Sequence, residues 1–280
     1  MPAFIRTLTP DGLQPVDYAD IIRRADSLND AARHEPLDGV YTVTNNYNTY
    51  QTLKLDAHLD RLEDSARRAG IPLVLDRARL RSALRRMIAE AGYGDVRFRI
   101  TVPRDAAHLI ISLEPFAPVP PELIASGVRC ITVPGGARRD PAVKKTAWMR
   151  AREQIKESMP PGVYDAILLD RAGNMLEGLS SNFYAVLNGE LRTAREGVLP
   201  GIAQQVVFEI APPIVSVRRE AVNVSQIPQL SEAFITSSSR GIVPIVEIDG
   251  HIIGSGLLGA KTLALRDAYT AWVAAHLQDL

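Results

Sequence analysis

Two short stretches organise this 280-residue sequence, Val143-Lys144-Lys145-Thr146-Ala147-Trp148 and Leu176-Glu177-Gly178-Leu179-Ser180-Ser181-Asn182-Phe183. The first places a primary amine after an aliphatic residue and just before a helical pattern. The second places a carboxylate in a turn that opens an apolar strand. An amine can form an imine, and a nearby carboxylate can hold a proton, so the two stretches together suit covalent catalysis. Taken separately, they are typical of a solvated loop and an ordinary turn.

The composition narrows the class of partner. Lys plus Arg and Asp plus Glu each number 32, and apolar residues make up 46% of the chain. A balanced charge argues against a nucleic acid or an anionic membrane as the partner, and no apolar run approaches membrane-spanning length. The single cysteine, Cys130, lies in an apolar run and cannot form an intrachain disulfide, which predicts a buried strand residue in a reducing cytoplasm. The five histidines lack metal-ligand spacing, so no metal site is expected.

Hydrophobic periodicity predicts alternating helices and strands along the whole chain. Asp56 is expected to cap the second helix, and Asn188-Gly189 is a strong type I′ hairpin signal. The expected helices are 17–32, 56–69, 78–91, 146–158, one beginning at 202, and 256–277. The expected strands are 40–44, 52–55, 96–102, 108–113, 128–133, 164–169, 182–187, 232–236 and 242–248.

Two arginines share one face of the strand over 96–102. Arg97 and Arg99 alternate there with apolar residues, and they could face solvent, a subunit contact or an anionic substrate. Solvent or a subunit contact is the favoured interpretation.

The proline-dense stretch 115–121 marks the best domain boundary, because prolines at that density favour an extended connector. We therefore expect an N-terminal domain over 1–117, a linker over 118–124 and a larger domain over 125–280.

Four segments in this order resemble the class IV aminotransferases, the fold-type IV group of branched-chain aminotransferases, D-amino-acid aminotransferases and aminodeoxychorismate lyases. They are the two opening stretches, Leu199-Pro200-Gly201-Ile202, and the run from Phe234 to Pro244 with its three serines. The resemblance extends from about Gly39 to Gly259. It implies an α/β (α+β), two-domain D-amino-acid aminotransferase-like fold, with a small N-terminal and a larger C-terminal domain and the cofactor, pyridoxal 5'-phosphate, in the cleft between them.

The resemblance also implies residue roles. The family lysine usually follows an aliphatic residue, which favours Lys144, after Val143, over Lys145 as the residue that bonds the cofactor. Glu177 would pair with the ring nitrogen. The implied phosphate ligands are Arg61, Ser238 and the amides of Ile202 and Ala203; the implied substrate residues are Tyr41, Ser239 and Arg240.

Some of these assignments have a plain alternative. Arg61 lies off the apolar stripe of its helix, where a solvated arginine is the simpler interpretation, and Tyr41 could be an ordinary strand tyrosine. Many relatives have Thr-Arg after the Pro-Gly-Ile element, where this chain has Ala203-Gln204. Backbone contacts to phosphate survive that change, but a side-chain hydroxyl contact does not.

The implied activity is transfer of an amino group between an amino acid or amine and a 2-oxo acid, by a homodimer. A lyase of the aminodeoxychorismate type and a non-catalytic binding protein on the same fold are the alternatives. The sequence leaves the amino donor and its stereochemistry open.

Overall fold

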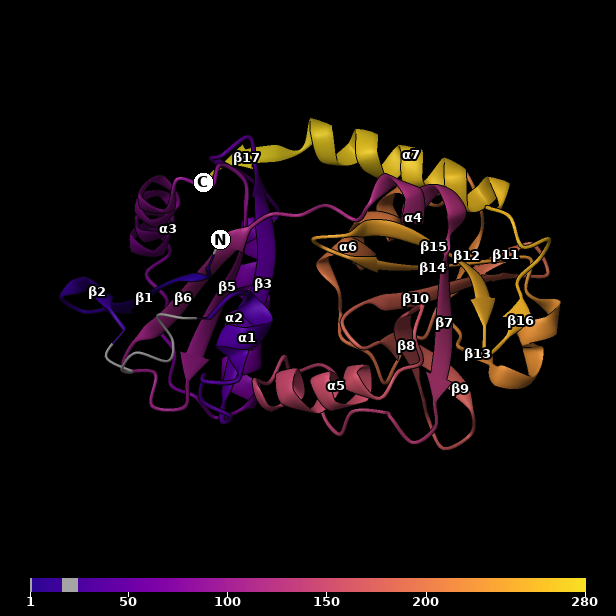
Figure 1. The fold of residues 1–280 in the computed structure, drawn as a ribbon, viewed down its shortest axis with the longest axis horizontal. Coiled ribbons are helices and arrows are strands. Elements are labelled where there is room, and N and C mark those ends of the chain that lie inside the picture. Colours follow the sequence, from indigo (N-terminus) through magenta and orange to yellow (C-terminus); the bar gives the residue numbers. More distant parts are fainter. Residues whose placement is uncertain (1, 17–24) are drawn as a thin grey trace. The chain divides into compact units, whose positions relative to one another are not determined.

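The computed structural model describes residues 2–16 and 25–280. They form two compact units, each built on its own β-sheet (Figure 1). Unit 1 comprises Met1–Ala117, Val143–Glu153 and His276–Leu280, and unit 2 comprises Pro118–Ala142 and Gln154–Ala275. Each unit is therefore assembled from segments that are separated in the sequence, and the lysines belong to unit 1 while Glu177 belongs to unit 2.

Unit 1 contains a seven-stranded sheet in the order β17-β4-β3-β5-β6-β1-β2, in which every neighbouring pair is antiparallel. The strands are β1 Phe4–Thr9, β2 Gly12–Pro15, β3 Gly39–Tyr47, β4 Gln51–Leu53, β5 Val96–Pro103, β6 Leu109–Pro115 and β17 Leu277–Asp279. The helices are α1 Leu28–Ala32, α2 Leu55–Arg68, α3 Arg77–Ala91 and the first part of α5, Ala147–Glu157.

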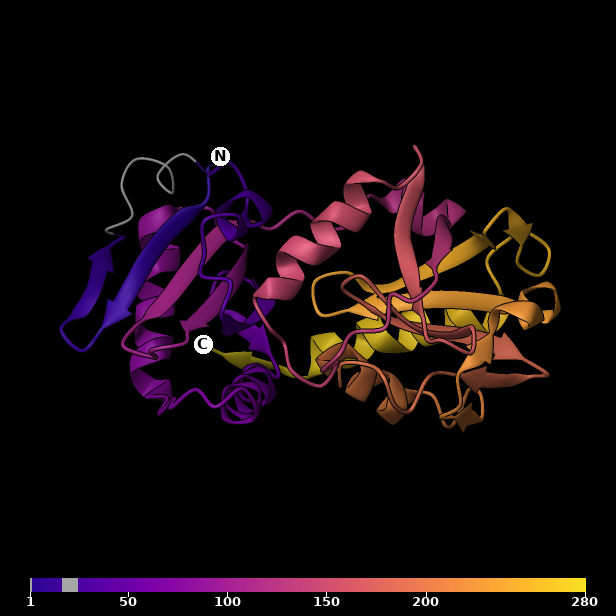
Figure 2. The same cartoon turned by 90° about the horizontal axis from the view of Figure 1, so that it is seen from below.

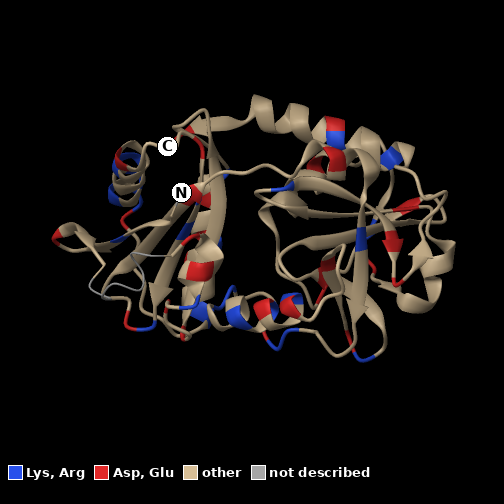
Figure 3. Cartoon of the chain, viewed as in Figure 1, with Lys and Arg blue, Asp and Glu red and all other residues tan. Residues whose placement is uncertain are grey.

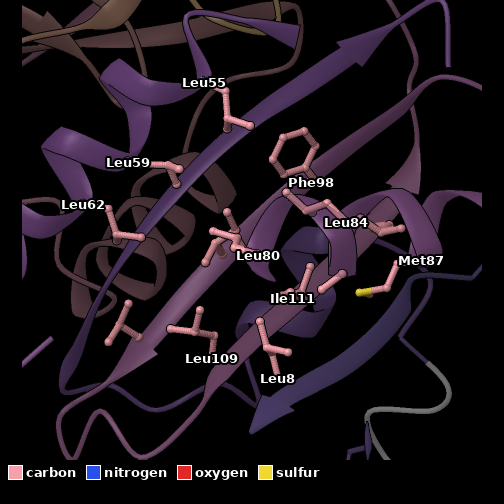
Figure 4. Close-up of a cluster of buried hydrophobic side chains, with 14 of the residues drawn as sticks. Leu8, Leu55, Leu59, Leu62, Leu80, Leu84, Met87, Phe98, Leu109 and Ile111 are labelled. Carbon is pink, nitrogen blue, oxygen red and sulfur yellow. The ribbon is translucent and has the colours of Figure 1, made fainter. Parts of the chain in front are cut away.

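Helices α2 and α3 pack against one face of this sheet through apolar residues three or four positions apart (Figure 4). Leu59 and Leu62 of α2 and Phe98 of β5 all belong to this core. The predicted N-cap of α2 is wrong: the cap is Lys54, in a left-handed backbone conformation, and Asp56 lies inside the first turn. An acid there still interacts favourably with the helix dipole.

The opposite face of the sheet carries a buried ion pair. The solvent or subunit position predicted for the two arginines is wrong for Arg99, which is 2% exposed and pairs with Glu35, itself 3% exposed. Glu35 also accepts hydrogen bonds from Thr101 and Ser112, and Arg99 donates to the Leu28 carbonyl at 2.7 Å. Strand alternation correctly separated this face from the core, but the segment that covers it comes from elsewhere in the sequence.

Arg97, on the same strand face, is half-buried and donates to Glu114 at 3.0 Å. It is therefore an ion-pair residue of the β5–β6 pair.

Unit 2 contains a ten-stranded mixed sheet. Its strands are β7 Val128–Val133, β8 Val163–Leu169, β9 Asn174–Gly178, β10 Asn182–Leu187, β11 Glu190–Arg192, β12 Val217–Arg218, β13 Val222–Asn223, β14 Glu232–Ser237, β15 Gly241–Ile248 and β16 His251–Ile252. Its helices are α4 Pro121–Ser126, α6 Ile202–Ile210, the 3₁₀ helix η2 Val224–Gln229 and α7 Ala260–Ala275.

Six of these strands close on themselves. The path β10-β14-β15-β7-β8-β9 returns to its start because β9 also pairs with β10, through the single partner pair Glu177 and Asn182. One apolar cluster that includes Cys130 packs on these strands, so the cysteine is the buried strand residue that was predicted. A second cluster lies under α6 and α7, which pack beside one another (Figure 2).

Several local predictions are confirmed, and others need adjustment. Asn188 and Gly189 form the two-residue hairpin between β10 and β11, both with positive φ. Residues 17–24 of the predicted 17–32 helix lie outside the described residues, and α1 accounts for its end. The proline-rich connector is shorter than predicted, because Pro121 begins helix α4, where its fixed φ suits the first turn.

Charged residues of both signs are spread over both units, as the zero net charge requires (Figure 3). Among the described helices, none combines the length and the apolar character that crossing a membrane would need.

Candidate functional site

The lysine segment runs beside β3 as a short antiparallel partner. Tyr41 N donates to the Lys144 carbonyl and Thr146 N donates to the Gly39 carbonyl, both at 3.0 Å, so that Val40 and Lys145 face each other. Side chains alternate along such a segment, and Lys144 therefore shares the face of Tyr41. Its Nζ lies 4.7 Å from the centre of the Tyr41 ring.

Val143 anchors this segment, because its side chain is buried in the core under α2 and α3. The aliphatic residue that pointed to Lys144 thus has a packing role. The choice of Lys144 over Lys145 stays a prediction, and the opposite facing of the two side chains makes it testable.

Helix α2 presents a polar face to the lysine segment. His58, Arg61 and Ser65 are three and four residues apart, which places them on one side of a helix. Ser65 Oγ accepts a hydrogen bond from Lys144 N at 3.3 Å, and His58 Nδ1 lies 3.1 Å from Thr42 Oγ1.

The pKa of His58 depends on its burial and on two neighbouring positive charges. Burial, followed by the positive charges of Arg61 and Lys144, holds the pKa of His58 well below 6.5, so the ring is neutral. Arg61 is half-buried, and its charge acts on this ring, as does that of Lys144. Sequence reasoning used Arg61 but missed His58 and Ser65, although their spacing from Arg61 was a usable signal.

Tyr41 is 1% exposed, and its neighbours lie on two sides. Lys144 approaches the ring face, while Arg152 of α5 places Nη1 3.5 Å from the phenolic oxygen. Sequence reasoning missed Arg152, because only the fold brings α5 back to β3.

Glu177 of unit 2 is a buried carboxylate with fixed partners. Arg138 donates to Oε1 from Nε at 2.8 Å and from Nη2 at 2.6 Å, and Leu199 N donates to Oε2 at 2.9 Å. Arg138 also donates to the Pro141 carbonyl at 2.7 Å. A guanidinium in this position favours the ionised form of the carboxylate, which can accept a further hydrogen bond. Arg138 was missed, because nothing in the sequence links it to a partner 39 residues away.

Asn182 connects Glu177 to the start of helix α6. It faces Glu177 across the β9–β10 pair and Thr236 across the β10–β14 pair, and its Nδ2 donates to the Leu199 carbonyl at 2.9 Å. A Cβ on Gly201 would lie 1.9 Å from Asn182 Oδ1, so a side chain at this N-cap would require Asn182 to move.

Helix α6 begins at Ile202 directly after that glycine. The first N–H groups of an α-helix have no intrahelical acceptor, and those of Ile202 and Ala203 are the ones that the sequence assigned to a phosphate. Gln204 Nε2, in the same turn, is buried with no hydrogen-bond partner among the described residues.

The serine-rich turn links β14 to β15. Ser237 and Gly241 form its closing pair, and Ser238 and Ser239 are half-buried between them. Arg240 binds within unit 2: Nε donates to Ser237 Oγ at 2.9 Å, Nη1 to Asp165 Oδ2 at 3.3 Å and Nη2 to Ser180 Oγ at 3.0 Å.

Asp165 ties this turn to the one that follows Glu177. Besides Arg240, it accepts hydrogen bonds from Leu179 N at 3.1 Å and from Ser181 Oγ at 2.9 Å. Arg240 therefore orders both turns, and its predicted place beside a substrate carboxylate stays a prediction.

The donor set fits the cofactor that the sequence implies. Unit 1 holds Lys144 against Tyr41 and Arg61 near His58, an amine and a cation of the kinds that the cofactor's aldehyde and phosphate would need. Unit 2 groups an ionised Glu177 with a glycine-led helix start, which supply a partner for a protonated ring nitrogen and amides for a phosphate.

Comparison with known proteins gives the family. The family model described as amino-transferase class IV matches residues 39–248. A proposed branched-chain-amino-acid aminotransferase of Methanocaldococcus jannaschii is 29% identical over 252 residues, covering 83% of this chain and 86% of the relative. The D-alanine aminotransferase of Bacillus licheniformis is 28% identical over 245 residues, covering 82% and 86%.

A solved structure shows the same fold. The branched-chain aminotransferase of the thermophilic archaeon Thermoproteus uzoniensis, determined with norvaline, superposes with a TM-score of 0.78 over 100% of this chain and 99% of the other, at 21% identity. Because the family model covers most of the chain, from β3 to the end of β15, this protein belongs to the class IV aminotransferases, which depend on pyridoxal phosphate.

Proposed function

We propose that this aminotransferase moves an amino group between an amino acid or amine and a 2-oxo acid, with Lys144 as the residue that bonds pyridoxal phosphate. The observation that carries the assignment is the position of Lys144 on the Tyr41 face of β3, with Nζ 4.7 Å from the ring centre. The bridge with Val40 turns Lys145 to the other face.

Each proposed ligand has a separate task. Bound pyridoxal phosphate supplies an electron sink for the bonds at the substrate's amine-bearing carbon. Arg61, the Ile202 and Ala203 amides and Ser238 would hold its phosphate, and Glu177 would keep a proton on its ring nitrogen. The Arg138–Glu177 pair supports that role, because it keeps Glu177 ionised and fixed in direction.

Lys144 would also move the proton. With the amino substrate bound, Lys144 Nζ would act as a general base at the amine-bearing carbon. Tyr41 packs against that amine, and the Ser65 hydroxyl holds the backbone of the same residue. Ser239 and Arg240, in the turn tied to Asp165, would border the substrate carboxylate.

The proposal includes a homodimer that acts in the cytoplasm. The single, buried Cys130 suits a reducing compartment, and the dimer rests on the family resemblance. Sedimentation of the purified protein measures its oligomeric state.

The test is a half-reaction. An amino donor alone should convert the visible absorption of the yellow holoenzyme to a near-ultraviolet band that persists, because the nitrogen stays on the cofactor. A 2-oxo acid should then restore the visible band. A lyase would recover its visible band with no acceptor, and a binding protein would release no product. If no donor in a panel of L-, D- and achiral amines shifts the band, while aminodeoxychorismate yields pyruvate without an acceptor, the proposal fails in favour of the lyase.

A further inference from the structure

Helix α2 is held in unit 1 by two hydrogen bonds to neighbouring segments. His58 Nδ1 lies 3.1 Å from Thr42 Oγ1 of β3, and Ser65 Oγ accepts a hydrogen bond from Lys144 N at 3.3 Å. His58 and Ser65 are both fully buried. A shift of the helix would break these bonds in the interior, where an unmade hydrogen bond is costly. The helix is therefore fixed both to β3 and to the lysine segment.

The backbone of Lys144 is held from two sides. Its N–H donates to Ser65 of α2, and its carbonyl accepts from Tyr41 N of β3 at 3.0 Å. Lys145 N donates instead to the Val143 carbonyl at 3.1 Å, within the lysine segment itself. Removing the Ser65 hydroxyl would take away the acceptor of Lys144 N, so the peptide group would turn toward another acceptor and redirect the Lys144 side chain.

Arg61 lies on the same helix, between the two residues that hold it. It comes three residues after His58 and four before Ser65, so all three share one side of α2. Because a helix rises about 1.5 Å per residue, Arg61 and Ser65 are about 6 Å apart along the helix axis, and this spacing does not change when the helix moves as a unit. A ligand that fixes the position of α2 through Arg61 therefore also fixes the Ser65 hydroxyl.

We infer that Ser65 is a positioning residue that couples the phosphate end of the cofactor to the lysine. This inference rests on the proposed function, in which Arg61 binds the phosphate and Lys144 Nζ bonds the aldehyde carbon, whose oxygen leaves as water. The phosphate would place α2 through Arg61, and Ser65 would place the Lys144 backbone to match. A cofactor that lacks the phosphate is not held at Arg61 and can follow the lysine in whichever direction it points. Ser65 should therefore matter mainly for the phosphorylated cofactor.

The experiment titrates the cofactor-free full chain with pyridoxal phosphate and with pyridoxal, which differ only in the phosphate. The visible band gives the dissociation constant of each aldehyde, and Lys144→Ala supplies the background from other lysines. Ser65→Ala should weaken binding of pyridoxal phosphate about fivefold, the factor that corresponds to one neutral hydrogen bond. Binding of pyridoxal should weaken less than about twofold. Ser82→Ala should change neither constant, because the Ser82 hydroxyl is exposed and bonds the Ala78 carbonyl of its own helix, α3.

A double variant distinguishes coupling from two independent effects. If the phosphate acts through α2, Ser65→Ala should cause no further loss of pyridoxal phosphate affinity in an Arg61→Ala background. Ser65→Cys fills a similar space with a weaker acceptor, and should reproduce the selective loss even where Ser65→Ala folds poorly. The inference is overturned if both aldehydes weaken equally, if neither weakens, or if the Ser65→Ala effect is undiminished without Arg61.

This outcome is separable from failure of the proposed function, because the titrations involve no turnover. A wild type that transaminates, while Ser65→Ala keeps the wild-type ratio of the two dissociation constants, retains the function and loses the inference. A protein that shows the selective loss but transaminates no donor loses the function and retains the inference. A visible band that persists in Lys144→Ala overturns both.

Discussion

Replacing Arg138 by methionine should destabilise unit 2 strongly, because it removes the guanidinium that donates twice to the buried Glu177 carboxylate. The Arg138 and Glu177 side chains are only 8% and 5% exposed, and the two guanidinium contacts to Oε1 measure 2.6 and 2.8 Å. Breaking a buried ion pair from one side costs about 3–5 kcal/mol. Methionine keeps an unbranched stem of similar length, so lost packing contributes little.

The matched control is Arg129→Met. Arg129 pairs with Glu247 at 2.9 Å between β7 and β15 of the same unit, but its side chain is 53% exposed. An exposed ion pair contributes at most about 1 kcal/mol, so this variant should lose no more than that. Burial is the main difference between the two substitutions.

The assay is guanidinium denaturation of the cofactor-free protein, followed by far-ultraviolet circular dichroism. The double variant Arg138→Met with Glu177→Met should recover part of the loss, because no buried carboxylate is then left without its guanidinium. The reasoning is refuted if Arg138→Met loses no more stability than Arg129→Met, or if the double variant is less stable than Arg138→Met alone.

Three further outcomes are expected. Lys144→Ala should abolish the visible absorption of the purified protein and Lys145→Ala should keep it, because the two side chains leave opposite faces of the segment; the reverse pattern would assign the cofactor to Lys145. Arg61→Ala should lose cofactor on dialysis while its circular dichroism stays native, and unchanged retention would return Arg61 to the role of a solvated helix residue. For His58, whose pKa is held well below 6.5 by burial and then by Arg61 and Lys144, the unfolded state binds a proton that the folded state does not. The contribution of neutral His58 to the free energy of unfolding should therefore be fully present above pH 6.5. Below pH 6.5 the free energy of unfolding should fall by up to about 1.4 kcal/mol per pH unit. Denaturation at several pH values should show a smaller dependence on pH in His58→Gln.

Local patterns in the sequence predicted much of the secondary structure. The alternation over 96–102 identified the two faces of β5, and Asn188-Gly189 identified the hairpin between β10 and β11. Both signals depend on residues close together in the chain, whose side-chain directions follow from backbone geometry alone.

Contacts between distant residues were not predictable in this way. The burial of Arg99 depends on Glu35, 64 residues away, and the fixed direction of Glu177 depends on Arg138. The cap of α2 failed for a different reason: Asp56 has the usual chemistry of an N-cap, but the chain enters the helix through a left-handed Lys54. For the site, the sequence identified candidate residue types, and only the fold adds Arg138, Asn182, Asp165 and Arg152.

The closing pair of the six-stranded ring has a practical consequence for redesign. Asn182 is at once the strand partner of Glu177, the hydrogen-bond donor to Leu199 and the residue whose Oδ1 lies closest to Gly201. One substitution there would remove the hydrogen bond to Leu199 and change the packing beside Gly201 at the same time, so its effect on Glu177 could not be separated from its effect on the start of α6. Tyr41 lies in the other unit, so substitutions there leave the surroundings of the Glu177 carboxylate as they are.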